Sequence, residues 1–217
     1  MVRVIIFVEG QTEEGFVKEL LVKHFQNLNI FLYPILLRTS KEGKGGISRS
    51  YAKLKRQIEK ICKEDQSAFI TTMIDYYGLP KDFPGKAETS ANMESFEMAL
   101  LVEKRFESDM NYRNFIANIQ IHEFEALLFS DLSKFENWFD PSIIKSLQNE
   151  ASGSNTPEHI DDKPETHPSA RILMHCHKYQ KPLHGVLIAL DIGLEIIRRA
   201  CKHFDEWLTK LESLCNN

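Results

Sequence analysis

The sequence has few of the features that would assign it to a specialised class. Its cysteines contain no Cys-x-x-Cys pair, so neither a disulfide framework nor a structural zinc site is expected. No run approaches the ~18 apolar residues that a membrane helix needs, and the apolar start Val4–Val8 is too short for a signal peptide. We therefore expect a soluble, cytoplasmic protein without membrane contacts.

The chain also lacks a large net charge, but its charges are unevenly distributed. Hydrophobic residues make up 42% and charged residues 27% of the sequence, values typical of a globular protein, and the formal net charge is −4. Nine basic residues lie between Arg38 and Lys63 against two acidic ones, Glu42 and Glu59, so the remainder is strongly acidic. A local basic segment on an acidic chain favours contact with a polyanion such as nucleic acid.

The first 130 residues alternate between short apolar runs and amphipathic segments. Strands are expected at 2–8, 33–37, 68–74 and 114–121. Helices are expected from an N-cap at Thr12 onward, after the glycines of 43–46, over 93–106 and over 122–129. This alternation predicts an α/β fold with an open, mainly parallel sheet flanked by helices.

The remainder of the chain differs in composition. Residues 151–168 collect Ser, Gly, Asn, Pro and acidic residues and predict a loop, whereas the sequence after Ser169 indicates helices. We expect an α/β core over 1–135 and a loop with a helical C-terminal extension over 136–217. We expect both to pack as a single domain rather than two.

Acidic residues follow three of the predicted strands. Glu9, Asp75 and Glu123 come at the strand ends, with Glu125 and Asp131 close behind. In open α/β sheets the carboxyl ends of the strands border the functional crevice, and clustered carboxylates suit a hard cation such as Mg²⁺ or Mn²⁺. The alternative is that these acids are ordinary loop and N-cap residues.

Basic and helix-starting residues offer candidate phosphate contacts. Lys44 lies in a glycine-rich stretch that can cradle a phosphate or serve as a plain turn, and no P-loop pattern is present. Arg49, Lys53 and Arg56 form one stripe at helical spacing, facing either nucleic acid or solvent. Ser169 and Arg171 follow Pro168 and can open a helix whose N–H groups face a phosphate, or can serve as surface residues.

Several segments together resemble a known family. They are Phe7–Glu14, Asp75–Gly78, His122–Phe129 with Asp131, Pro164–Arg171, Lys181–Gly185 and Cys201–Leu208. This ordered set resembles the bacterial Toprim-like domain-of-unknown-function family 4276. Its members are similar to the Toprim domains of topoisomerases, primases and OLD-type nucleases, and are commonly encoded beside AAA-type ATPases in what look like defence loci.

The resemblance implies roles at individual positions. Glu9 matches the acid after the first Toprim strand, and Asp75 matches the first acid of the Toprim Asp-x-Asp. Tyr77 stands in place of the second acid, so Glu123, Glu125 or Asp131 would have to supply the missing ligand. Gly10, Tyr77 and His122 are candidate phosphate or base contacts, although Tyr77 can also be a packing residue and His122 can satisfy a backbone group. The family pattern adds three further polar candidates, Lys181, Arg198 and His203.

These observations support three hypotheses. The first is a Mg²⁺- or Mn²⁺-dependent nuclease or phosphoryl-transfer protein with Glu9, Asp75 and Glu123 as catalytic residues, acting in anti-phage defence with an ATPase partner. The second is a degenerate, non-catalytic Toprim module that binds an ATPase partner or nucleic acid. The third is hydrolysis of a small phosphorylated substrate.

Overall fold

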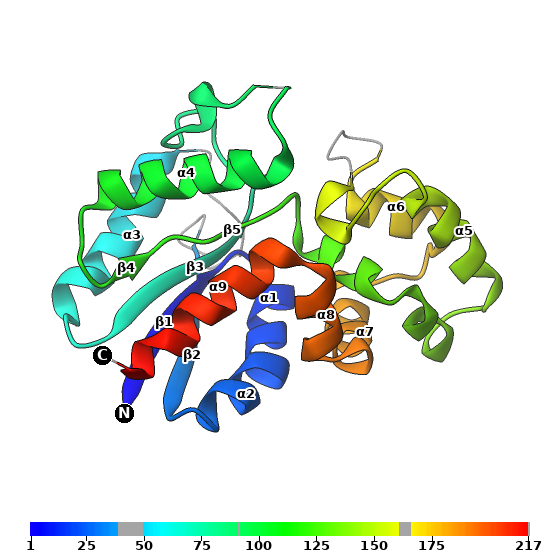
Figure 1. Cartoon of the computed structure of the whole chain (residues 1–217), viewed down its shortest axis with the longest axis horizontal. Coiled ribbons are helices and arrows are strands. Elements are labelled where there is room, and N and C mark those ends of the chain that lie inside the picture. Colours follow the sequence, from blue (N-terminus) through cyan, green and yellow to red (C-terminus); the bar gives the residue numbers. More distant parts are fainter. Residues whose placement is uncertain (39–49, 91, 161–165, 217) are drawn as a thin grey trace.

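The protein is built around a parallel sheet. The computed structural model describes residues 1–38, 50–90, 92–160 and 166–216, and within these ranges the strand order is β2-β1-β3-β4, with β5 paired to β3 beyond β4 (Figure 1). The strands are β1 (Val2–Val8), β2 (Ile30–Leu36), β3 (Phe69–Asp75), β4 (Phe115–Ile116) and β5 (Ile119–Gln120). All the pairings are parallel, which confirms the predicted fold class.

The strands follow the predicted runs with two differences. Strand β2 begins three residues earlier than expected and holds Pro34 at the sheet edge, where a missing N–H costs no ladder bond. The single strand expected over 114–121 is divided into β4 and β5. Between them, the backbone groups of Asn118 bind a side chain instead of a neighbouring strand. The Thr72 hydroxyl donates to the Asn118 carbonyl at 2.7 Å and accepts from the Asn118 N–H at 3.1 Å.

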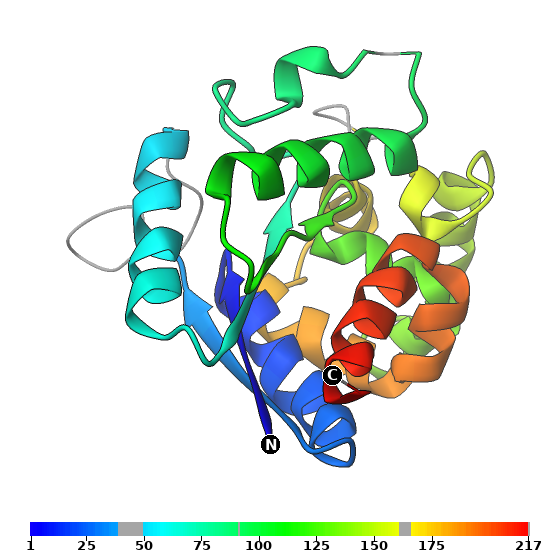
Figure 2. The same cartoon turned by 60° about the vertical axis from the view of Figure 1, so that its left-hand side comes forward.

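Helices cover both faces of the sheet and continue beyond it. They are α1 (Gln11–Phe16), α2 (Val22–Gln26), α3 (Tyr51–Glu64), α4 (Ser95–Met110), α5 (Ser142–Ala151), α6 (Pro168–His175), α7 (Val186–Ile192), α8 (Leu194–Ala200) and α9 (Lys202–Glu212). Helices α3 and α4 lie on one face, and α1, α2 and α9 on the other (Figure 2). Short 3₁₀ helices include η3 (Phe124–Ser130) and η5 (Pro157–His159).

Each sheet face has its own apolar core. Leu54, Ile58 and Phe106 from α3 and α4 are buried against Ile70 of β3. On the opposite face, the buried Trp207 of α9 packs with the β1 side chains and donates its indole N–H to Thr71 at 3.0 Å. Burial of these large side chains contributes on the order of 2 kcal/mol each and fixes the helices on the sheet.

Buried polar contacts connect helix α9 to η5 and to α4. The Glu158 carboxylate accepts from the N–H groups of His203 and Phe204, each at 3.0 Å, and so caps the helix. His203 Nε2 lies 2.9 Å from Glu103 Oε1 on α4, and this carboxylate raises the pKa of the imidazole although burial opposes the rise. The last helix is therefore held by residues distant in sequence.

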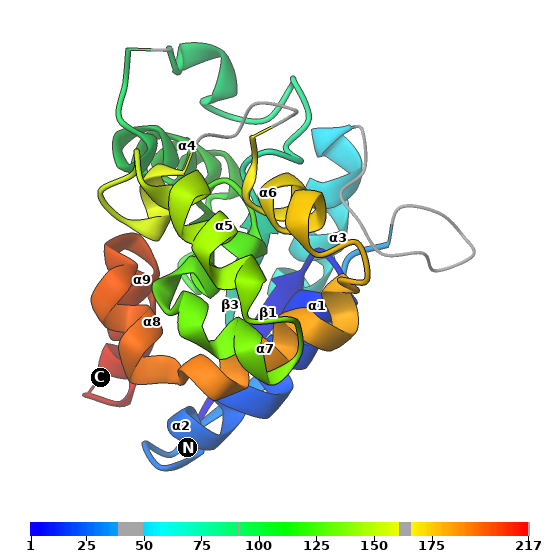
Figure 3. The same ribbon diagram turned by 90° about the vertical axis from the view of Figure 1, so that its right-hand side faces the viewer.

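Of the helices between η3 and α8, α5 and α6 lie beyond the end at which the strands finish, whereas α7 packs beside α1 (Figure 1). We call α5, α6 and α7, together with the segments that connect them, the extension; Figure 3 shows it face on. Helix α6 begins at Pro168, directly before the expected Ser169. In the described part of the chain, no helix combines the length and apolar character that crossing a membrane requires.

Candidate functional site

The strand order creates a crevice between the ends of β1 and β3. The chain leaves β1 through α1 on one face toward β2, whereas it leaves β3 through α4 on the other face toward β4. The carboxyl ends of β1 and β3 therefore form the topological switch point, where open α/β sheets bind ligands. Glu9 and Asp75 occupy these two ends.

Glu9 and its neighbour Glu13 stand at the start of α1. The Asp75 N–H donates to Glu9 Oε2 at 3.3 Å, and the Gly10 N–H donates to Glu13 Oε2 at 2.8 Å. Helix α1 begins at Gln11 after an extended Gly10, so the N-cap expected at Thr12 is wrong, because the Glu13 carboxylate binds the N–H at position 10 instead. A Cβ on Gly10 would lie 3.1 Å from that carboxylate oxygen, so a larger residue here would require the Glu13 side chain to shift.

Asp75 connects the end of β3 to the segment after β5. Its Oδ1 accepts from the Phe124 N–H at 3.1 Å, at the start of η3. His122 just before it has a φ of 62°, a left-handed conformation that is uncommon outside glycine, and its carbonyl accepts from the Tyr77 N–H at 3.1 Å. This backbone turn brings Glu123 and Glu125 to the same edge as Asp75.

Glu123 has the largest number of hydrogen-bond and ion-pair partners among the acids at this edge of the sheet. Its Oε1 accepts from the Ser169 N–H at 2.6 Å and lies 2.7 Å from His167 Nδ1, while Oε2 accepts from the Ser169 hydroxyl and from Lys181 Nζ, both at 3.0 Å. Glu123 therefore caps α6 from a distance of 46 residues in sequence. The predicted N–H of Ser169 is thus present at a helix start, and a carboxylate of the protein occupies it.

The same contacts argue against a Ser-His-Glu triad. The Ser169 hydroxyl lies 3.2 Å from His167 Nδ1, the same nitrogen that meets Glu123. A relay needs the acid and the nucleophile at opposite ring nitrogens. Ser169 is also fully enclosed, with 2% of its surface exposed, so the arrangement positions Glu123 instead of activating a serine.

Glu125 completes the cluster. Tyr179 donates its hydroxyl to Glu125 Oε1 at 3.4 Å, and Lys181 Nζ lies 3.2 Å from Oε2. Gly185 makes room for this contact, because a Cβ there would lie 3.0 Å from the Tyr179 hydroxyl. We call Glu9, Glu13, Asp75, Glu123 and Glu125 the acidic cluster, which Lys181 contacts from the extension.

The three members of the acidic cluster at the ends of β1 and β3 all have raised pKa values. Burial raises the pKa of Glu9 to about 7, and the Glu13 carboxylate adds to the rise. Burial also raises the pKa of Glu13. Burial and the Glu9 carboxylate raise the pKa of Asp75 well above its ordinary range. The protein therefore supplies too few positive charges and hydrogen-bond donors at the switch point to keep these three carboxylates fully ionised.

The two acids beside Lys181 differ from each other. Burial raises the pKa of Glu125 to about 7 against the opposing effect of the ammonium. Burial acts in the same direction on Glu123, but Lys181, the Ser169 N–H and His167 outweigh it, so the pKa of Glu123 is lowered. The cluster thus divides into an ionised, fully hydrogen-bonded Glu123 and neighbours that compete for protons.

The donor set of the switch point suits a hard divalent cation. Glu9, Glu13 and Asp75 offer only oxygen ligands, and their raised pKa values reflect a need for positive charge that a bound cation would supply. Among the residues that the structure describes, no group of three or more His, Cys, Asp or Glu side chains is already arranged to hold a metal ion. The oxygen donors thus fit the ion chemically. In the metal-free protein, the N–H groups of Asp75 and Gly10 hold the carboxylates of Glu9 and Glu13, respectively.

Other predicted residues lie in different settings. The Asp131 carboxylate accepts from the N–H and hydroxyl of Ser133 and caps the next turn. The Arg171 guanidinium binds the carbonyls of Thr166 and Glu150. These contacts give Asp131 and Arg171 local structural roles within the extension.

The basic residues are described in part. Lys53 and Arg56 are exposed on the first half of α3, whose start is bound by Asp82 from the loop after β3. This contact places them at the same edge of the sheet as the acidic cluster. Lys44 and Arg49 lie outside the described residues.

Sequence reasoning missed several members of the site. Glu13 is not among the acids that the strand ends predict, although its position four residues after Glu9 places it near the end of β1. His167 and Tyr179 come from the extension. Since no periodicity connects them to β1 or β3, only the fold reveals their contacts.

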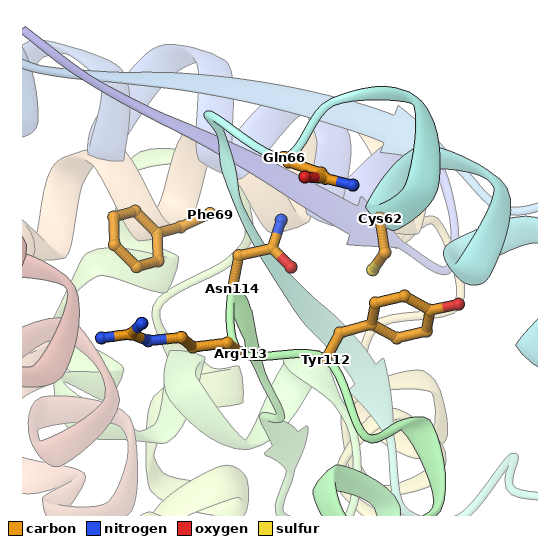
Figure 4. A pocket seen from close by; sticks show the side chains of 6 residues that line it. All are labelled: Cys62, Gln66, Phe69, Tyr112, Arg113 and Asn114. Atoms are coloured by element: carbon orange, nitrogen blue, oxygen red, sulfur yellow. The ribbon is translucent and has the colours of Figure 1, made fainter.

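A cavity of about 490 Å³ lies at the opposite edge of the sheet. It is lined by Cys62, Gln66, Phe69, Tyr112, Arg113 and Asn114 (Figure 4). Phe69 begins β3 and Asn114 precedes β4, so this cavity lies at the amino ends of the strands. The Tyr112 and Arg113 side chains point in opposite directions, and the lining offers no convergent set of charges.

Comparison with known proteins identifies the family. A family model described as a domain of unknown function (DUF4276) matches residues 8–212, so the chain belongs to this family, as its motifs predict. Two solved structures of the C-terminal region of the OLD protein from Xanthomonas campestris pv. campestris are similar. One is 13% identical over 96% of this chain and 97% of that chain, with a TM-score of 0.41; the other is 14% identical over 100% and 98%, with a TM-score of 0.41. A search among curated proteins found no match.

Proposed function

We propose that the protein is a divalent-metal-dependent hydrolase of nucleic-acid phosphodiesters. The observation that supports this most strongly is the placement of Glu9 and Asp75 at the two strand ends of the switch point, where the Asp75 N–H donates to Glu9 and where Glu13 follows at the start of α1. These three residues would hold Mg²⁺ or Mn²⁺. When bound, the ion would polarise the phosphodiester and lower the pKa of a bound water.

The protein's own residues supply the remaining functions. Burial raises the pKa of Glu9 to about 7 in the metal-free protein, so its carboxyl group would release its proton near neutral pH when the ion binds. Lys181 holds Glu123 and Glu125 in fixed positions through its ammonium group. Lys53 and Arg56, exposed at the same edge, contact the phosphate backbone and orient the strand.

The test is titration calorimetry with MnCl₂ on the wild type, Glu9→Gln and Asp75→Asn. We expect Mn²⁺ binding in the wild type and its loss in both variants, because each removes one carboxylate charge from the same crevice. Asp131→Asn is the matched control and should bind like the wild type, since the Asp131 carboxylate caps a local turn. Undiminished binding in the first two variants would place the metal elsewhere and contradict the proposal.

A cleavage assay follows on single-stranded and duplex DNA and RNA with Mn²⁺ or Mg²⁺. Loss of cleavage in the same two variants, on the order of 100-fold or more, is expected for residues at the reacting centre. Hydrolysis of free nucleotides without cleavage of polymers would support a small phosphorylated substrate instead. A wild type that neither binds Mn²⁺ nor cleaves would support the non-catalytic module, whose partner is an ATPase or nucleic acid.

A further inference from the structure

Tyr77 is an exposed aromatic residue next to the acidic cluster. It lies two residues after Asp75, and 47% of its surface is exposed. Its backbone is fixed, because its N–H donates to the His122 carbonyl at 3.1 Å. The neighbouring Tyr76 behaves differently, since its hydroxyl meets Thr89 at 3.0 Å and its ring packs under an ammonium group. Packing therefore accounts for Tyr76 and leaves the exposed ring of Tyr77 to be explained.

The Tyr77 ring is part of an aromatic pair. Its centroid lies 5.3 Å from that of His167, and the two planes are inclined by 31°. His167 is itself held by Glu123, with Nδ1 at 2.7 Å from Oε1. The pair thus connects the turn after β3 to the start of α6, and its histidine contacts Glu123 of the acidic cluster.

We propose that Tyr77, supported by His167, is a stacking platform for an unpaired nucleobase next to the scissile phosphate. This inference rests on the proposed function and names its substrate class, which is single-stranded nucleic acid. A base in a duplex is stacked on both faces, so its ring is not accessible to a side chain, whereas an unpaired base offers a free face to an aromatic ring. Stacking is sequence-tolerant, so little preference among bases is expected.

The chemistry of the position supports this assignment. A carboxylate two residues after Asp75 would add negative charge to a crevice that the five carboxyl groups of the acidic cluster already border. A phenol adds none and leaves a flat apolar surface beside a phosphodiester, which carries its own negative charge. Tyr77 thus improves contact with a nucleotide where a further acid would repel it.

The experiment measures binding of a fluorescein-labelled oligothymidylate 12-mer by fluorescence anisotropy, with EDTA and separately with CaCl₂. We expect Tyr77→Leu to weaken single-strand binding by about tenfold or more and Tyr77→Phe to retain it, because the ring is what stacks. Tyr33→Leu is the matched control, since Tyr33 is 49% exposed on β2, and should bind like the wild type. A matched duplex should bind less tightly than the single strand and be insensitive to Tyr77→Leu.

Each remaining outcome is decisive. Unchanged single-strand binding in Tyr77→Leu, equal losses in the Leu and Phe variants, or a wild type that fails to prefer the single strand in both buffers would overturn the stacking role. Circular dichroism and thermal unfolding check that the variants fold. If stacking is confirmed but Mn²⁺ neither binds nor supports cleavage, only the hydrolase proposal is wrong. If metal-dependent cleavage is observed and is unaffected in Tyr77→Leu, only the stacking proposal is wrong.

Discussion

Lys181 determines how the individual acids of the site behave. Its ammonium lies between Glu123 and Glu125, at 3.0 Å and 3.2 Å. Glu123 receives additional N–H and O–H donors, so its pKa is lowered, whereas the pKa of Glu125 reaches about 7 despite the same cation. Because both carboxylates face the same ammonium group, the deeper burial of Glu125 and the additional donors to Glu123 account for the difference.

Lys181→Met should destabilise the protein by about 2 kcal/mol at about pH 8, because it leaves buried carboxylates without their cation. The loss should be smaller at about pH 6, where Glu125, whose pKa is about 7, is already largely protonated. Urea unfolding at both pH values measures the difference. Lys18→Met removes an exposed ion pair with Glu14 and should change stability by less than about 0.5 kcal/mol; a pH-independent loss in Lys181→Met would contradict the electrostatic explanation.

Helix α3 presents exposed positive charge near the end of the sheet at which the strands finish. Leu54 and Ile58 bury one side of it against the sheet, which leaves Lys53 and Arg56 exposed on the other. The contact between the Tyr51 N–H and Asp82 anchors its first turn to the loop after β3. This anchoring keeps the exposed Lys53 and Arg56 on the half of the helix that begins beside the loop after β3.

The double variant Lys53→Ala/Arg56→Ala should weaken nucleic-acid binding uniformly across sequences and reduce the slope of log affinity against log salt by about 2. Anisotropy titrations at several KCl concentrations measure the slope. Lys60→Ala is the control, because Lys60 lies in the second half of the same helix and pairs with Glu64 at 3.9 Å. A loss of affinity as large in Lys60→Ala as in the double variant would indicate diffuse attraction instead of a defined path.

The molecule as a whole places acids where they cost stability. Glu9 and Glu125, with pKa values of about 7, bind protons in the folded state that the unfolded chain, with ordinary values near 4.5, releases. The free energy of unfolding should therefore fall as the pH rises from about 5 through about 7, by about 2 kcal/mol or more. Such a cost is typical of sites whose charges await a ligand.

Thermal unfolding between about pH 5 and pH 8, with and without millimolar MnCl₂, tests this expectation. We expect the ion to raise the midpoint more at about pH 8 than at about pH 6, because protons compete with it for the carboxylates. Glu9→Gln should flatten the pH dependence and stabilise the metal-free protein at about pH 8. Equal slopes in the wild type and this variant would show that Glu9 does not titrate in the predicted range.

The local sequence determined the elements and the first acids of the site. The β-branched run of β1 and the apolar periodicity of α3 and α4 depend on neighbours in the chain, so the parallel α/β fold was predictable and is confirmed. Glu9 and Asp75 were predictable for the same reason, since they directly follow buried strands. Their roles in metal binding stay predictions.

Tertiary structure decided which groups meet these acids. Glu123 obtains its partners from residues 44 to 58 positions later, and the interruption between β4 and β5 depends on a Thr72 hydroxyl 46 residues away. Such contacts leave no periodic signal in the sequence, because they depend on how α6 and the extension dock on the sheet. The sequence alone therefore places acids at strand ends, while the packed fold determines which are neutralised, which hold protons and which aromatic ring stands beside them.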